Sequence, residues 1–374
     1  MITREFPPKA AGIGYYVYYL SKNLLKRGHK VDVITRGSSK KTTIETIDGI
    51  NVFNVSYTPV YPFHIYLHGF FVNNILKSLE SKLSIVHLHS PLPPPIKTSL
   101  PVITTVHSSC KRAFKNTYTD TYDIRSLAEK LQSMILYPSI ESNILKHSDK
   151  ITTVSSNVSD ELSAYGLNSE AITVVGNGVD EKVFVPNKSK TQTKPYVLFV
   201  GILRSGKGVF DLLKCAKYVC EKRPDVRFLL CGWGPLLKNL QDKAVKIGLQ
   251  KQIIFLGHTG RSKLVKLYQN ATLLVQPSYH EGLSTVILEA MSCGLPVVAT
   301  DIDGNRTVIS SGLNGILVPP KSPESMARSI LKLLNDANVR ERIGRAARST
   351  IEDQYSWDKI TDNIIKCYEK LLQQ

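Results

Sequence analysis

Hydrophobic and polar positions alternate in two similar series, one on each side of a polar segment that runs from Pro186 to Pro195. Short runs of β-branched residues are followed by longer stretches in which apolar residues recur every three or four positions. The short runs predict buried strands, and the longer stretches predict amphipathic helices. In the first half we expect strands at 30–35, 51–55, 85–89, 102–106, 150–154 and 172–175, and helices at 15–27 and 124–147.

The second half repeats the scheme, with helices between strands expected at 196–200, 227–231, 253–256, 273–276, 297–299 and 315–318. Strand–helix pairs at this spacing imply right-handed crossovers and a parallel sheet, so each half is predicted to be a doubly wound, Rossmann-like α/β domain. We place the first domain at 1–186, a linker at 187–194 and the second domain at 195–354. Ligands of such folds bind at the carboxyl ends of the strands, so a cleft between the two domains is expected.

The beginning of the chain is unusual, because Met1 to Arg4 leaves almost no length for a first strand. The strand is therefore very short or missing, or the start codon is misassigned. No signal sequence and no run of about 18 apolar residues is visible, so a cytoplasmic protein without a membrane span is expected.

Composition narrows the class of protein further. The 374 residues are 42% hydrophobic, which is enough for two full cores, and the net charge is +17, most of it after residue 186. This charge favours anionic partners such as nucleotides, phospholipid head groups, glycan phosphates or nucleic acid, and the sign alone does not choose among them.

Cysteine and histidine spacings do not indicate a metal site. The six cysteines include no C-x-x-C pair and are interpreted as buried thiols. His87 and His89 would share one face of a strand without an evident third ligand, and Asp301 and Asp303 are interpreted as part of a turn.

Two carboxylates eight residues apart, Glu281 and Glu289, are the most informative pair in the chain. They follow an expected strand and bracket an expected helix that begins at Ser284 or Thr285. The free amides of the first helical turn and the helix dipole favour an anion such as a pyrophosphate, while carboxylates accept hydrogen bonds from hydroxyls. Spacing alone also fits a surface helix with two solvated acids.

The segment from Glu281 to Thr300 resembles the donor site of glycosyltransferase family 4, whose members are retaining enzymes of the GT-B fold. The resemblance extends over nearly the whole chain. The motifs that follow in the family's order lie at 6–14, 27–35, 85–90, 104–107, 154–156, 175–184, 196–208, 231–235, 255–258 and 313–320.

The resemblance implies a glycosyltransferase, and a hexosyltransferase in particular, that needs no cofactor or metal and uses a nucleoside diphosphate sugar as co-substrate. It assigns Glu281 to hydroxyls of the donor sugar, Glu289 to the ribose and Lys207 to the leaving phosphate, and it places His107 near the donor sugar. The catalytic residues expected are therefore His107, Lys207 and Glu281. The further donor-binding residues expected are Gly12, Gly14, Arg204, Gly257, His258, Gly282, Leu283, Ser284, Thr285, Val286 and Glu289. The resemblance also implies that the terminal helix at 355–374 packs back on the first domain.

Two departures from the family pattern concern the donor site. Ile202 stands where an arginine is usual, with Arg204 two residues further on, and Thr307 stands where glutamate is common. A catalytically degenerate protein that binds sugar nucleotides is therefore one alternative.

A second alternative comes from Gly201, Gly206 and Lys207, which are one residue short of a P-loop, but Gly208 stands where the hydroxyl of a P-loop NTPase would be. A nucleic-acid-binding protein would use the charge but would leave the two glutamates unexplained. The acceptor is not readable: it could be a glycan or a lipid-linked precursor reached by peripheral contact with an anionic inner membrane face.

Overall fold

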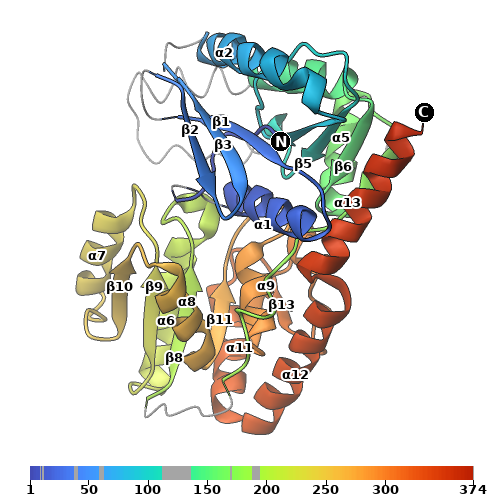
Figure 1. Ribbon diagram of the computed structural model, residues 1–374. Helices are drawn as coiled ribbons and strands as arrows, with labels where there is room; N and C mark the ends of the chain where they lie inside the picture. The colour runs from blue at the N-terminus through green and yellow to red at the C-terminus, as the bar shows by residue number, and fades with distance from the viewer. Residues whose placement is uncertain are drawn as a thin grey trace. The chain divides into compact units, whose positions relative to one another are not determined.

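The computed structural model describes the chain except residues 9, 11, 38–40, 59–62, 112–135, 169–170, 188–193 and 374 (Figure 1). Most of the linker expected at 187–194 and about half of the helix expected at 124–147 lie outside the described residues. The described chain forms two compact units, one made of the residues up to Asn177 together with those from Trp357 onward, the other of Gly178–Ser356.

The first unit is built on parallel strands that match the hydrophobic runs. β1 (Asp32–Arg36) pairs with β3 (Ile50–Val55), and β4 (Val86–Ser90), β5 (Val102–Val106), β6 (Lys150–Thr153) and β7 (Ile172–Val174) follow one another in a second parallel series. Ile2 forms parallel bridges to both Ile34 in β1 and Leu88 in β4. The first strand is thus present as a very short one, between β1 and β4.

One strand departs from the expected parallel pattern. β2 (Thr43–Ile47) pairs antiparallel with β3 at the edge of the sheet. Four of its five residues are exposed. An exposed edge strand does not need the apolar run from which the other strands were predicted. The first sheet is therefore mostly rather than wholly parallel.

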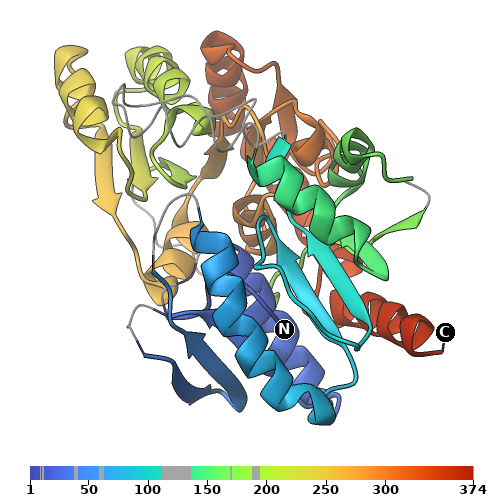
Figure 2. The ribbon, with the colours of Figure 1, turned by 90° about the horizontal axis from the view of Figure 1, so that it is seen from above.

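The helices of the first unit include the C-terminal one (Figures 1 and 2). They include α1 (Gly12–Lys26), α2 (His64–Leu79), α5 (Ser156–Leu162) and α13 (Trp357–Leu372), with short 3-10 turns at Glu80–Lys82 and Ser163–Tyr165. The Trp357 ring stacks on Tyr19 at 5.7 Å between centroids and meets Tyr16 edge-on at 5.1 Å. Arg27 on α1 donates hydrogen bonds to Asp358 and Asp362 on α13. The terminal helix is thus fixed to α1 by packing and by charge.

The second unit is a parallel sheet of six strands in the order β10-β9-β8-β11-β12-β13. Its strands are β8 (Tyr196–Val200), β9 (Arg227–Cys231), β10 (Ile253–Gly257), β11 (Leu273–Gln276), β12 (Val297–Thr300) and β13 (Ile316–Val318). In chain order this is the 3-2-1-4-5-6 arrangement of dinucleotide-binding folds, in which the order reverses between the first and fourth strands, here β8 and β11. Ligands of such sheets bind at that switch point.

Amphipathic helices cover this sheet. They are α6 (Val209–Lys222), α7 (Leu237–Lys246), α8 (Arg261–Asn270), α9 (Thr285–Ser292), α10 (Asp303–Arg306), α11 (Pro323–Asn335) and α12 (Ala337–Gln354), with a 3-10 turn at Ser205–Lys207. Two contacts attach the residues that follow Gly178 to this unit. Val179 forms a β-bridge with Ser356. The carbonyl of Phe184 accepts hydrogen bonds from Ser292 and Arg348.

The six cysteines are buried free thiols, as predicted. Within the described ranges, no helix is both long and apolar enough to cross a membrane.

Candidate active site

The loops that follow β8 and β11 meet at the switch point of the second sheet. The amide of Tyr279 donates a hydrogen bond to the carbonyl of Gly206, which ties the two loops together. Gly208 has a φ of 64°, and a Cβ at that position would overlap the carbonyl oxygen of Pro277. Only glycine fits this left-handed, crowded position without strain. The close approach brings the side chains of both loops to one place.

Lys207 and Glu281 form an ion pair at this junction. The Nζ of Lys207 lies 2.5 Å from Oε1 of Glu281, and the two side chains are only 18% and 12% exposed. Gln276, at the end of β11, donates a second hydrogen bond to the same oxygen at 3.1 Å. Burial raises the pKa of Glu281, but the Lys207 ammonium and the hydrogen bonds outweigh it and hold that pKa below its ordinary value. Glu281 is therefore a carboxylate with a fixed orientation.

The helix between the two glutamates begins where the sequence places it. Ser284 is the N-cap residue of α9 and makes no side-chain capping bond, and Thr285 is the first helical residue. The amides of a first helical turn have no partner within the helix. Leu283 and Ser284 are buried, whereas Gly282, Thr285 and Val286 are partly exposed. This end of α9 directly follows the loop that carries Glu281.

Glu289 lies one turn further along α9, and its side chain is only 13% exposed. Its Oε2 accepts a hydrogen bond from the Tyr268 hydroxyl at 3.0 Å, and its Oε1 lies 3.7 Å from Nη1 of Arg261. Burial raises the pKa of Glu289, an effect that Arg261 and Tyr268 only partly offset. The two carboxylates on either side of the helix start therefore have pKa values displaced in opposite directions.

Three other residues of the expected donor site belong to this unit without joining the ion pair. Arg204 is exposed and precedes the turn that carries Lys207, and among the described residues it forms no ion pair. Gly257 ends β10 with a φ of 65°, and His258 after it is exposed.

His107, Gly12 and Gly14 belong to the first unit. Gly12 begins α1, and the amide of Gly14 donates a hydrogen bond to Oε1 of Glu5 at 3.2 Å. His107 follows β5, lies 3.3 Å from Nδ1 of His89 through its Nε2, and meets the Tyr16 ring at 4.6 Å between centroids. Burial lowers the pKa of His107 to about 3, so its ring is neutral near pH 7.

Sequence reasoning missed three residues that orient the two carboxylates: Gln276, Tyr268 and Arg261. Gln276 carried a usable signal, since it is the polar last residue of an otherwise apolar, buried strand. Tyr268 and Arg261 come from α8, whose approach to α9 is a tertiary contact without a local sequence signature. Within the described part of the chain, no group of three or more His, Cys, Asp or Glu residues is placed to hold a metal ion.

Two family models cover most of the chain. The model described as Glycosyltransferase Family 4 matches residues 10–183, and the one described as Glycosyl transferases group 1 matches residues 180–350. The chain belongs to the group 1 glycosyltransferases, as its motifs predicted. It is 28% identical to an uncharacterized glycosyltransferase of Methanocaldococcus jannaschii over 99% of this chain and 97% of that protein.

Solved structures show the same fold. Sucrose-phosphate synthase from Thermosynechococcus elongatus superposes with a TM-score of 0.81 and 21% identity over 100% of this chain and 98% of that one. Anabaena HepE in complex with UDP and glucose superposes with a TM-score of 0.74 and 16% identity over 98% of each chain. The predicted GT-B fold is confirmed, and the protein is a glycosyltransferase.

Nothing supports the NTPase alternative. A P-loop needs a Ser or Thr hydroxyl where this chain has Gly208. The positive φ of Gly208 and its packing against Pro277 exclude such a side chain unless the loop moves.

Proposed function

We propose that this glycosyltransferase moves a sugar from a nucleoside diphosphate sugar to an acceptor hydroxyl with retention of anomeric configuration. The observation that carries the proposal is the Lys207–Glu281 pair at the switch point of the second sheet. It places a cation suited to a phosphate beside a carboxylate suited to sugar hydroxyls, directly before the free amides of α9.

Each residue of the pair has a distinct role in this proposal. Lys207 turns from Glu281 to the diphosphate, and Glu281 then accepts hydrogen bonds from the donor sugar. The amides of Ser284, Thr285 and Val286 hold the diphosphate at the positive end of the helix dipole. Glu289, held by Tyr268, accepts hydrogen bonds from the ribose hydroxyls. Roles for His107, Gly12 and Gly14 toward the donor remain predictions from the family resemblance.

The reaction breaks the bond between the sugar C1 and the phosphate oxygen and forms a bond from C1 to the acceptor oxygen. The electron pair of the broken bond leaves with the nucleoside diphosphate, and the departing phosphate oxygen takes the proton that the acceptor hydroxyl gives up. Lys207 and the α9 amides stabilise the negative charge that develops on the departing phosphate. Removing one such group typically costs about 10²–10³ in kcat.

UDP-sugars are the first donors to test, because the structurally similar Anabaena protein was solved with UDP and glucose. For the acceptor we propose a glycan or lipid-linked precursor, reached by peripheral contact with an anionic membrane. The support is the net charge of +17, since basic residues near an anionic surface contribute about 1 kcal/mol each.

The test is a donor screen. The full chain is incubated with UDP-, GDP- and ADP-sugars in EDTA, and nucleoside diphosphate release is followed for the wild type, Lys207→Gln and Glu289→Ala. Lys238→Gln is the matched control, since Lys238 is 84% exposed and pairs with Asp242 on its own helix.

Release from one donor that persists in Lys238→Gln and falls about 10²-fold or more in Lys207→Gln supports the proposal. If no nucleotide is released and no nucleotide causes a thermal shift, the result would instead support a degenerate site.

A further inference from the structure

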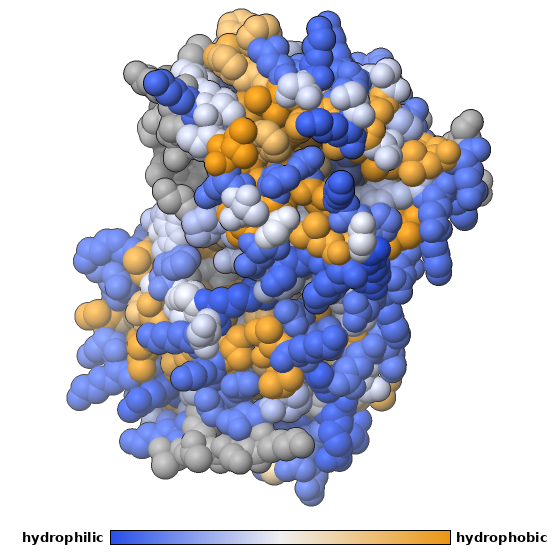
Figure 3. Space-filling view, viewed as in Figure 1, coloured by the Kyte–Doolittle hydropathy of each residue, from blue (hydrophilic) through white to orange (hydrophobic). Residues whose placement is uncertain are grey.

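A buried carboxyl group in the first unit is not among the residues of the proposed donor site. Glu141 belongs to the helical residues 136–146 and is only 1% exposed. Figure 3 shows hydrophilic residues spread over the viewed face of the protein, where water solvates them. A carboxyl group away from water loses that solvation and must find hydrogen-bond donors within the protein. The partners of Glu141 therefore show which segments it holds together.

The donors to Glu141 come from three different segments. Its Oε1 accepts a hydrogen bond at 2.5 Å from the hydroxyl of Ser90, the last residue of β4. Its Oε2 accepts one at 2.7 Å from the amide of Cys110, in the loop after β5, and one at 2.6 Å from the hydroxyl of Tyr165. The two oxygens of a carboxylate offer about four acceptor positions, so one glutamate can serve all these donors. Burial raises the pKa of Glu141, and the hydrogen bonds offset this rise only in part.

The two oxygens of Glu141 hold both ends of the segment from His107 to Cys110. The Cys110 end is bound directly. At the other end, the amide of His107 donates a hydrogen bond at 3.3 Å to the carbonyl of Ser90, whose hydroxyl binds Glu141. The chain and these hydrogen bonds thus form a closed ring. Neither end of the segment can move without breaking a hydrogen bond of the ring, which is costly for buried groups.

Neighbouring contacts hold the same loop. Ser109 donates hydrogen bonds to Oε2 of Glu161 on α5, from its amide at 3.3 Å and from its hydroxyl at 2.8 Å. The amide of Lys111 donates a hydrogen bond at 3.0 Å to the hydroxyl of Tyr165. Three successive amides after β5, at positions 109–111, are therefore bound by side chains that are themselves buried. Loops at a protein surface commonly leave such amides to water, so this loop is more firmly fixed than most.

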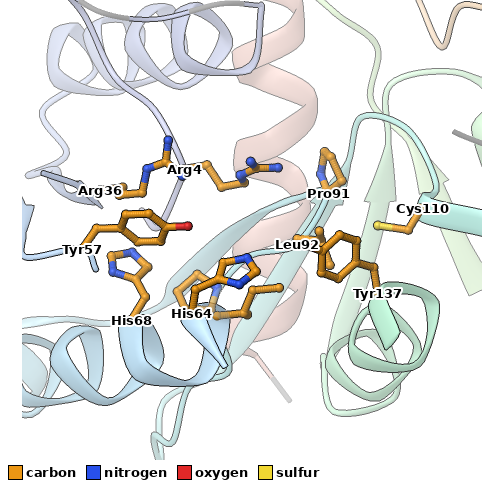
Figure 4. A pocket seen from close by; sticks show the side chains of 11 residues that line it. Arg4, Arg36, Tyr57, His64, His68, Pro91, Leu92, Cys110 and Tyr137 are labelled. Atoms are coloured by element: carbon orange, nitrogen blue, oxygen red, sulfur yellow. The ribbon is translucent and has the colours of Figure 1, made fainter. Parts of the chain in front are cut away.

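The loop also forms part of the wall of a cavity of about 220 Å³ in the first unit (Figure 4). Cys110 lines this cavity together with Pro91 and Leu92, which follow β4, and with Tyr137 from the helical segment that carries Glu141. The ring of hydrogen bonds therefore shapes this wall as well as the backbone at His107.

From this arrangement we infer that Glu141 is a positioning residue for glycosyl transfer: it fixes the loop after β5 so that His107 keeps its place toward the donor sugar. The inference rests on the proposed function, in which His107 lies near that sugar. The ring of His107 packs against Tyr16 and His89, so a shift of its backbone would change these contacts too. A displacement of about 1 Å in a group that acts on the substrate can cost about 10²-fold in rate.

The experiment compares Glu141→Ala and Glu141→Gln with the wild type, each as the full chain. Alanine leaves the hydroxyls of Ser90 and Tyr165 and the amide of Cys110 without their acceptor. Glutamine keeps an oxygen for Cys110 and Tyr165, and its amide group can donate to the hydroxyl of Ser90, so it is the conservative replacement. All assays are made at a temperature at which circular dichroism shows every variant to be folded.

Glu80→Ala is the matched control. Glu80 also accepts hydrogen bonds that tie two segments of the first unit, from the hydroxyl of Thr98 at 2.7 Å and from the amide of Ser99 at 2.9 Å. These contacts lie before β5, at the end of the strand opposite to His107. A loss of stability without a loss of positioning is therefore expected in Glu80→Ala.

The first readout separates binding from turnover. UDP-glucose is the donor, the kcat of UDP release is measured, and the Kd of UDP is determined calorimetrically. We expect Glu141→Ala to lower kcat about tenfold or more while the Kd of UDP stays within about twofold, because the groups proposed to bind UDP belong to the second unit. Glu141→Gln should recover most of the lost kcat, and Glu80→Ala should keep the kcat of the wild type. An unchanged kcat in Glu141→Ala would overturn the inference.

A double-variant cycle with His107→Gln separates positioning from a general loss of structure. If Glu141 acts through His107, Glu141→Ala causes no further loss of kcat in the His107→Gln background. A purely structural role would give losses that multiply, and this result would also overturn the inference.

Histidine ring signals in NMR spectra test the same point without turnover. The signal missing from His107→Gln identifies the ring of His107; it should shift in Glu141→Ala and stay in place in Glu80→Ala. A signal that does not move in Glu141→Ala would contradict the inference. Absence of UDP binding and of UDP release in the wild type would count against the proposed function, so the two failures are distinguishable.

Discussion

Gly208 lies so close to Pro277 that a Cβ on Gly208 would overlap the carbonyl oxygen of Pro277. At this point the loop after β8 touches the loop after β11. The contact holds Lys207, one residue before Gly208, beside the loop that carries Glu281. A residue without a side chain thereby positions the cation of the proposed donor site.

Replacing Gly208 by alanine should therefore damage both stability and the site. The new Cβ meets a backbone oxygen as well as an unfavourable φ, and we expect a loss of about 3 kcal/mol or more in the free energy of unfolding. Urea denaturation measures it. Gly248→Ala is the matched control, because Gly248 has a φ of 74° but nothing within 4 Å of a new Cβ. Its expected cost is about 1–2 kcal/mol, and equal losses in the two variants would contradict the role of the Pro277 contact.

Glu289→Gln should stabilise the protein near neutral pH. Because burial raises the pKa of Glu289 in the folded state, that state binds a proton more tightly than the unfolded chain. Stability is therefore lost as the pH rises from the unfolded value of about 4.3 through the folded pKa. Glutamine avoids this loss and still accepts the Tyr268 hydrogen bond.

The measurement is the free energy of unfolding of Glu289→Gln and wild type from pH 4 to pH 8. The difference should be near zero at the acidic end and grow in favour of the variant toward neutrality. Glu341→Gln, on an exposed part of α12, should follow the wild type throughout. A variant less stable than the wild type at pH 7 would show that Glu289 contributes to stability.

The histidine cluster of the first unit should make that unit sensitive to acid. Burial lowers the pKa of His107 to about 3 and holds those of His87 and His89 well below their ordinary value. The unfolded chain takes up protons below about pH 6.5 that the folded unit does not, so stability falls as the pH drops from about 6.5 toward 3.

Hydrogen exchange locates this effect. Between pH 7 and pH 5, after correction for the intrinsic rates, peptides from β4, β5 and α1 should lose protection before those from β8 and β11. His107→Gln should lose less stability over this interval than the wild type. His147→Gln replaces an exposed histidine and should lose as much stability as the wild type. Equal loss of protection in both units would contradict the prediction.

The contact of Trp357 with α1 should contribute much more to stability than the charges beside it. Trp357→Ala removes a buried ring that packs on Tyr16 and Tyr19, at an expected cost of about 3–5 kcal/mol. Arg27→Gln removes ion pairs whose aspartates are more than half exposed, at about 0–1 kcal/mol. Thermal and urea unfolding of both variants compare the two costs, and a larger loss for Arg27→Gln would reverse this ranking.

Much of this protein could be determined from its sequence alone. The strands at 102–106, 196–200, 227–231 and 273–276 were predicted to the residue, because buried parallel strands are continuous apolar runs bounded by polar turns. The start of α9 was readable because an N-cap serine and the two glutamates around it are local features. The order of the motifs also identified the family.

The tertiary structure alone decided which side chains meet. Lys207 and Glu281 are 74 residues apart, and nothing local shows that they pair. Tyr268 and Arg261 on α8 reach Glu289 on α9 across a distance in sequence that no local pattern bridges. The antiparallel β2 exists through its pairing with β3. Ile2 takes the place of a strand between β1 and β4 only through its bridges to Ile34 and Leu88. Periodicity along a chain reports which face of an element is buried, whereas contacts between elements depend on their packing, which no single segment encodes.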